Sequence, residues 1–182
     1  MVAMFPVDES AMNVTPEFSR QVTVDQLRAE PFRQRIEATA NERAALTRRF
    51  DLIALDRLSA EVVLRRRSPE SILLEAEFTA EFEQCCAVSL EPVRGTVCDR
   101  FSLVYGHAAD HEPEIAFENN EPAFEPLNGN SIDIGEAVAQ EFSLALPLFP
   151  RHPEAIIDDA VATKPLEGPF VALSRLRKDA EC

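Results

Sequence analysis

A run between Ile72 and Glu83, in which every second residue is apolar, constrains the fold of this chain more than any other feature. Apolar side chains occupy every second position of the run: Ile72, Leu74, Ala76, Phe78, Ala80 and Phe82. The positions between them are polar from residue 75 onward: Glu75, Glu77, Thr79, Glu81 and Glu83. Because successive side chains of a strand point to opposite faces of a sheet, this period of two predicts an antiparallel strand with one buried and one wet face.

Two flanking runs share this period. Before it, Leu58, Ala60, Val62 and Leu64 fall on one face of residues 58–67, and Ser68-Pro69-Glu70 forms a turn. After it, residues 93–105 keep their apolar side chains in phase, interrupted by Asp99. Shorter strands are predicted over residues 18–22 and 32–38. Together the runs predict an α+β protein built on an antiparallel meander, either a plain open sheet or a sheet curled into an open barrel.

Capping residues predict the helices that cover this sheet. Thr39 and Glu42 form a capping box, and the helix that they open has the predicted apolar face Ala45, Leu46, Phe50 and Ile53. Asp133 opens another helix, with Glu136 three residues later, which ends near Leu146 because Pro147 follows. A similar capping box at Thr23 predicts one helical turn before Pro31. We therefore expect two or three packed helices.

The length of the chain suits one domain with extended ends. We predict a flexible tail over residues 1–16, a single α+β domain over 17–150, and a linker with a short amphipathic tail over 151–182. Within the domain, residues 106–130 form a long acidic loop that is rich in proline and contains a short strand near residues 124–127. The C-terminal tail combines apolar and basic residues: Phe170, Leu173, Leu176, Arg175, Arg177 and Lys178.

The net charge of −14 is unevenly distributed. Residues 1–70 hold 11 basic and 11 acidic side chains, whereas residues 71–170 hold 4 and 19. Because acidic surfaces repel phosphate, the second half favours a basic protein as partner; the simpler interpretation is that its acidity maintains solubility. The carboxylates that we assign to partner binding are Glu75, Glu77, Glu81, Glu83, Asp133, Glu136 and Glu141.

Five arginines support an alternative function, direct binding of structured RNA. Arg65, Arg66 and Arg67 are consecutive, and with Arg48 and Arg49 they would form a small phosphate-contacting patch. The simpler interpretation is a solvated strand end beside a turn. Aromatic residues for stacking single-stranded bases are scarce, since the chain has one tyrosine and no tryptophan.

Motifs for catalysis are weak, so we predict no enzyme, no cofactor and no metal site. The five glycines are scattered, and no Gly-x-Ser-x-Gly occurs. His107 and His111 lie in the acidic loop and are interpreted as ordinary loop residues. The third hypothesis is a metal-dependent hydrolase in which acidic residues of this loop, 106–130, bind Mg²⁺. The four cysteines, at positions 85, 86, 98 and 182, have neither the spacing of a disulfide framework nor that of a zinc knuckle, and we expect reduced, buried thiols.

The sequence also lacks the marks of membrane insertion or secretion. No run approaches the roughly 18 apolar residues of a membrane span, and the N-terminus has no basic segment followed by an apolar one. We therefore expect a cytoplasmic protein with no membrane partner.

Two segments resemble the YceD-like family of large ribosomal RNA subunit accumulation proteins. They cover residues 84–93 and 131–152, and the resemblance extends over about residues 17–177. Its motif residues here are Cys86, Leu90, Pro92, Asp133, Leu146, Pro147 and Pro150. Many members carry Cys-x-x-Cys-Leu at the first segment, whereas this chain has Ser89 at the second cysteine position, which weakens the case for metal binding.

The resemblance implies a role in the synthesis, processing or stability of large-subunit ribosomal RNA, and no catalytic residue transfers with it. Genes of the family often neighbour that of a small basic ribosomal protein. The implied partners are a ribosomal protein or a large-subunit assembly intermediate, with large-subunit ribosomal RNA as the alternative. The oligomeric state stays open.

Overall fold

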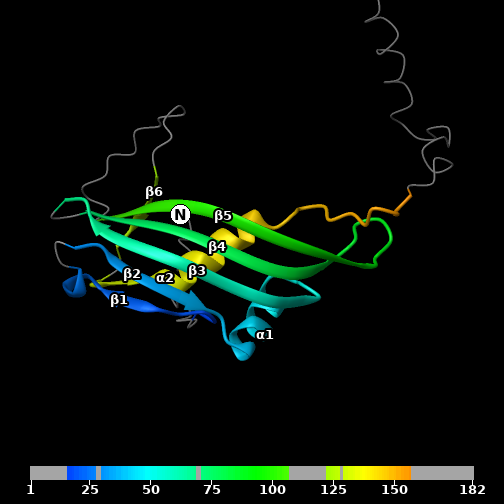
Figure 1. Cartoon of the computed structure of the whole chain (residues 1–182), viewed down its shortest axis with the longest axis horizontal. Coiled ribbons are helices and arrows are strands. Elements are labelled where there is room, and N and C mark those ends of the chain that lie inside the picture. The colour runs from blue at the N-terminus through cyan, green and yellow to red at the C-terminus, as the bar shows by residue number, and fades with distance from the viewer. Residues whose placement is uncertain (1–15, 28–29, 69–70, 107–121, 128, 157–182) are drawn as a thin grey trace, which may run out of the picture.

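The computed structural model describes residues 16–27, 30–68, 71–106, 122–127 and 129–156 (Figure 1). Its elements are, in chain order, β1 (Gln21–Thr23), the 3-10 turn η1 (Val24–Gln26), β2 (Phe32–Glu37), α1 (Ala40–Arg49), β3 (Ala54–Arg66), β4 (Ser71–Cys85), β5 (Pro92–Gly106), β6 (Ala123–Pro126), β7 (Ser131–Asp133) and α2 (Ile134–Ala145). The predicted α+β class is confirmed. The predictions for residues 1–15, most of the acidic loop and the amphipathic tail lie outside the described residues.

The main sheet has the strand order β2-β3-β4-β5-β6. Strands β2 to β5 form the predicted antiparallel meander, and β6 adds in parallel to the end of β5. The order is linear, with β2 and β6 at its two edges, so the sheet stays open rather than closing into a barrel. All six apolar residues of the alternating run on β4 are buried, which confirms the predicted period of two over residues 72–83.

The helices cover one face of this sheet and leave the other in solvent (Figure 1). Phe142 of α2 is fully buried, and its ring packs edge-on against Phe50, Phe78 and Phe82 at centroid distances of 5.7, 6.4 and 5.8 Å. Such edge-to-face contacts favour one arrangement of the helix on the sheet beyond the burial of apolar area. This aromatic cluster fixes α2 across β4.

A small second sheet, β1 paired antiparallel with β7, leads into α2. Asp133 ends β7 and caps α2, accepting hydrogen bonds from the backbone N–H groups of Gly135 and Glu136. It also accepts from the backbone N–H of Arg20, 2.8 Å away. The backbone of Phe18 approaches Gly135 so closely that a β-carbon at position 135 would clash with the Phe18 carbonyl oxygen.

Three local predictions were wrong. The first strand begins at Gln21 rather than at residue 18, because Phe18 forms a turn and is buried. Ile53 is outside α1 and 48% exposed, since the helix ends at Arg49 and Asp51 takes a left-handed conformation (φ 52°). The turn after Thr23 forms, but the Thr23 side chain makes no capping hydrogen bond in it.

Candidate functional site

The two segments that resemble the family meet at one end of the molecule. The β4–β5 turn follows Cys85, and the chain leaving α2 runs beside it (Figure 1). The backbone N–H of Ala87 donates to the carbonyl of Pro150 at 2.8 Å, and the side chain of Gln84 donates to the carbonyl of Pro147 at 3.3 Å. We call residues 84–92 together with 146–156 the junction.

Hydrogen bonds to the sulfur of Cys86 link the two segments of the junction. Its side chain is fully buried, and the sulfur accepts hydrogen bonds from the backbone N–H groups of His152, Ser89 and Val88 at 3.3 to 3.4 Å. The N–H of His152, followed by the donors at Ser89, lowers the pKa of the Cys86 thiol to about 6, and burial of the sulfur opposes this shift. The sequence could not reveal this contact, because His152 lies 66 residues away.

The other motif residues take structural positions around the junction or at the ends of α2. Pro92 begins β5 opposite Cys85, and Leu146 is the C-cap residue of α2. Leu90 adopts a left-handed conformation (φ 62°). Of the predicted thiols, Cys86 is buried as expected, whereas Cys85, at the end of β4, and Cys98, on the wet face of β5, are exposed.

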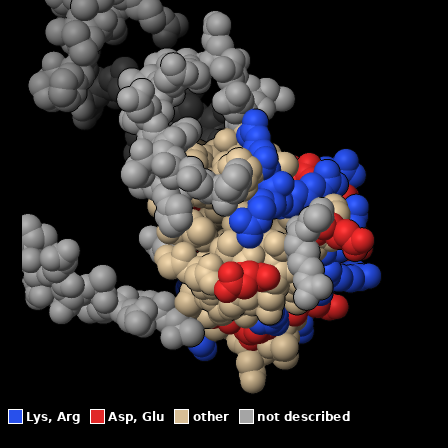
Figure 2. Space-filling model, turned by 90° about the vertical axis from the view of Figure 1, so that its left-hand side faces the viewer, with Lys and Arg blue, Asp and Glu red and all other residues tan. Residues whose placement is uncertain are grey.

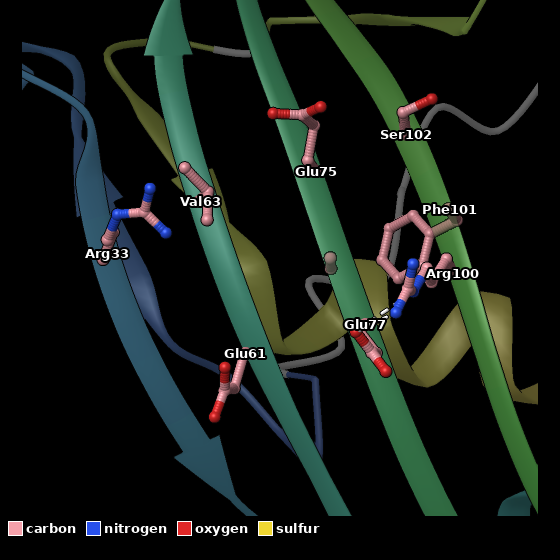
Figure 3. Close-up of a pocket in the computed structure, with 9 residues that line it drawn as sticks. Arg33, Glu61, Val63, Glu75, Glu77, Arg100, Phe101 and Ser102 are labelled. Carbon is pink, nitrogen blue, oxygen red and sulfur yellow. Dashed lines mark hydrogen bonds and ion pairs between the residues drawn. The ribbon is translucent and has the colours of Figure 1, made fainter.

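The wet face of the sheet is a shallow trough of about 610 Å³ (Figure 3). It runs across β2 to β5, and its polar lining comes from Arg33, Glu61, Glu75, Glu77, Arg100 and Ser102. Figure 3 shows Arg33 and Arg100 on opposite sides of the glutamates. This arrangement places both charge signs on one surface and fits a partner that offers both.

Each glutamate predicted on β4 is paired with an arginine of a neighbouring strand. The N–O distances are 3.6 Å for Glu75–Arg65, 3.0 Å for Glu77–Arg100, 3.9 Å for Glu81–Arg57 and 2.6 Å for Glu83–Arg94. Exposed pairs of this kind contribute little stability, commonly below about 1 kcal/mol. The four ion pairs place a positive charge beside each of these glutamates. The glutamates of β4 therefore do not form a purely acidic surface in the folded protein.

The predicted carboxylates near the start of α2 are also engaged. Asp133 caps the helix, and Glu136 forms an ion pair with Arg49 at 2.7 Å. Arg49 bonds Glu17 as well, at 2.9 Å, which ties α1 to α2 and to the N-terminal segment. Asp133, Glu136 and Glu17 therefore stabilise the packing of α1, α2 and the N-terminal segment.

An uncompensated group of carboxylates lies between α2 and the β5–β6 edge. Glu125 lines a hollow of about 270 Å³ there together with Tyr105 and Gln140. Burial and the neighbouring charges of Asp99 and Glu125 raise the pKa of Glu141, and burial followed by the charge of Glu125 raises the pKa of Tyr105. No Lys or Arg of the described chain forms an ion pair with Asp99, Glu125 or Glu141. We call these three residues the acidic edge.

Sequence reasoning identified Glu141 but missed Asp99 and Glu125. Asp99 had a visible signal, since it interrupts the apolar phase of residues 93–105. Glu125 had none, because its position depends on the parallel pairing of β6 with β5.

The five predicted arginines do not form one patch. Arg48 and Arg49 end α1, which leads into the start of β3, whereas Arg66 ends that strand, roughly 40 Å further along it. Arg65 instead gains Arg33 as a neighbour, since Arg33 pairs with Val63 two residues away. Figure 2, which views the end where β3 meets β4, shows basic side chains gathered along one side and interspersed with acidic ones.

Catalytic and metal-binding groups do not converge within the described residues. No three His, Cys, Asp or Glu side chains there are placed to hold a metal ion. His107 and His111 lie outside the described part of the chain, and His152 contributes its backbone to the junction. No helix of the described residues is long and apolar enough to cross a membrane.

Comparison with known proteins identifies the family. A family model described as large ribosomal RNA subunit accumulation protein YceD matches residues 74–168, more than half of the chain. The chain belongs to the YceD family. The matched part starts in β4 and includes the junction, the acidic edge and α2, but excludes Arg48, Arg49 and residues 65–67. Membership implies a role in the accumulation of large-subunit ribosomal RNA. No curated protein and no solved structure matched the chain.

Proposed function

We propose that this protein supports large-subunit ribosomal RNA accumulation without catalysing a reaction, by binding a basic ribosomal protein or a protein-rich assembly intermediate in the cytoplasm. The observation that carries the proposal is the acidic edge. On the wet face and at the start of α2, carboxylates are paired with arginines, whereas the charges of Asp99 and Glu125 repel that of Glu141, and Glu125 also lines a hollow. A cationic side chain bound near Glu125 and Glu141 would relieve this repulsion.

The surroundings of the acidic edge strengthen the argument. The connection between β5 and β6, residues 107–121, contains five acidic residues and neither lysine nor arginine. Its two attachment points, Gly106 and Pro122, flank the same edge. Tyr105 adds an aromatic ring beside the carboxylates, to which a lysine or arginine binds favourably. Charge complementarity of this kind mainly accelerates and selects the encounter, so the interaction should weaken with salt.

Two triple variants with the same change in net charge test the proposal. The edge variant is D99N/E125Q/E141Q, and the matched control on the paired wet face is E77Q/E81Q/E83Q. We expect tagged wild type and control to co-purify large-subunit proteins from growing cells, and the edge variant to lose them together with large-subunit ribosomal RNA. Equal losses with both variants would show that only net charge matters and would contradict the proposal.

Nuclease treatment separates this function from RNA binding. Partners held by protein contacts should remain after RNA is digested. Purified protein incubated with ribosomal RNA and Mg²⁺ should leave the RNA uncut, and cleavage that disappears with the edge variant would instead support the hydrolase hypothesis.

Direct RNA binding is a second candidate, favoured by the arginines around the β3–β4 turn. Arg65 lies on the wet face with Arg33 of β2 beside it, and Arg67 follows the end of β3. Figure 2 views this end of the molecule. The double variant R65Q/R67Q should reduce the salt dependence of RNA affinity by about 0.9 in slope for each phosphate that the two arginines neutralise in the wild type. The control R48Q/R94Q removes two arginines elsewhere and should leave the slope unchanged.

A further inference from the structure

Large apolar side chains are exposed around the junction. Leu90, Leu144, Leu148, Phe149 and Ile156 have exposed fractions between 75% and 89%. Among the described residues, the other large apolar side chains exposed by more than about a third are Val88, in the same turn, and Ile53, whose backbone N–H donates to the carbonyl of Glu83 next to the junction. Single exposed apolar residues are ordinary, but a cluster confined to one end indicates a docking surface.

This surface is held in place rather than loosely attached. The bonds from Gln84 to the Pro147 carbonyl and from Ala87 to the Pro150 carbonyl fix the chain on both sides of Leu148 and Phe149. Leu90 is held in a left-handed conformation (φ 62°), which is strained for a residue with a side chain, and that side chain still points into solvent. Backbone strain that no packing explains is typical of residues retained for a contact with another group.

The sequence offers an occupant tethered beside this surface. The described chain ends at Ile156, within the apolar cluster, and residues 157–182 follow. Phe170, Leu173 and Leu176 recur every three residues, as on one face of a helix. The thirteen residues between them and Ile156 have a typical end-to-end distance of about 20 Å, so the tether presents the segment at an effective concentration on the order of millimolar.

Charge favours the same occupant. Arg175, Arg177 and Lys178 accompany the three apolar residues. On the junction, Glu91 and Glu154 are exposed and form no ion pair with another described residue. A segment whose apolar residues contact Leu148 and Phe149 would place its cations near these two carboxylates.

We propose that residues 170–178 of this chain dock in cis on the apolar surface of the junction. The docked segment covers Leu90, Leu148 and Phe149 and pairs its basic residues with Glu91 and Glu154. This contact is separate from the acidic edge, so either proposal can fail without the other.

Hydrogen exchange of the full-length protein, followed by mass spectrometry, tests the docking. The surface variant L148S/F149S and the single variant L90N alter only exposed side chains, and L90N also relieves the left-handed strain. Val63→Ser is the control, a partly exposed apolar residue on the wet face of β3, toward the end of that strand that lies away from the junction. We expect amides of residues 170–176 to exchange about tenfold faster in both junction variants than in the wild type and the control, with urea midpoints not reduced.

Three outcomes overturn the proposal. Equal exchange of residues 170–176 in the wild type and the surface variant means that nothing covers this surface in cis. Protection that increases with protein concentration identifies the segment of a second copy as the occupant. Protection that appears only when cell extract is added identifies another protein.

Discussion

Replacing Asp133 with alanine should destabilise the protein by about 3 kcal/mol. The Asp133 carboxylate accepts five hydrogen bonds, from Ser19 Oγ, Arg20 N, Gln21 Nε2, Gly135 N and Glu136 N. Loss of the α2 N-cap costs about 1 kcal/mol. The part-buried N–H of Arg20 loses its acceptor, which costs about 1–3 kcal/mol more, whereas the two side-chain donors can turn to water.

Urea unfolding followed by circular dichroism measures this cost. With a denaturant slope of about 2 kcal/mol/M, the midpoint should fall by about 1.5 M. Asp133→Asn keeps the oxygen that serves Arg20 N and the helix, so it should lose only about 1 kcal/mol. A loss below about 1 kcal/mol for Asp133→Ala, or equal losses for both variants, would refute the reasoning. An unchanged midpoint with lost partner binding would instead restore Asp133 to the partner-binding residues.

Glu42, Cys86 and Gly135 support the remaining predictions. Hydrogen bonds from Arg20 lower the pKa of Glu42 from 4.5 to about 2, so its contribution is complete above pH 4.5 and lost as the pH falls through 2. Glu42→Gln should be about 1 kcal/mol less stable than wild type at pH 6, after allowance for solvent screening, and equally stable near pH 2 in urea titrations. In brief iodoacetamide labelling, exposed Cys85 should react and buried Cys86 should not until urea is added, despite its lowered pKa; labelling of native Cys86 would show that the junction opens. Gly135→Ala should cost about 2 kcal/mol or more in urea unfolding, because its β-carbon meets the Phe18 carbonyl; a wild-type midpoint would show that the two backbones separate freely.

Much of the sheet and of both helices follows from local patterns. The period of two over residues 58–67, 72–83 and 93–105 defined β3, β4 and β5, because alternation needs no knowledge of the partner strand. Capping residues located the starts of α1 and α2 for the same reason. The β1–β7 pair could not be predicted, because a three-residue strand is too short to show an alternation of apolar and polar residues. The two strands are also more than 100 residues apart in the sequence.

The candidate sites depend on tertiary pairing, and there the sequence was a weaker guide. The junction needs a contact between Cys86 and His152, which only the path of α2 across the sheet creates. The motif residues of the junction could be identified in the sequence, but the contact between the two segments could not. The hydrophobicity of Leu148 and Phe149 would predict buried side chains, whereas both are exposed.

The charge distribution shows why net charge along a sequence is an incomplete guide to surface potential. Residues 71–83 carry glutamates at most alternate positions from 75 onward, yet antiparallel register places arginines of β3 and β5 beside them. Glu141 looked no different in the sequence, but its neighbours in space are Asp99 and Glu125. Carboxylates thus give a neutral face in one place and a repulsive edge in the other. Under the proposed function, a bound cation relieves the repulsion on Glu141, so a basic partner should select the acidic edge over the wet face.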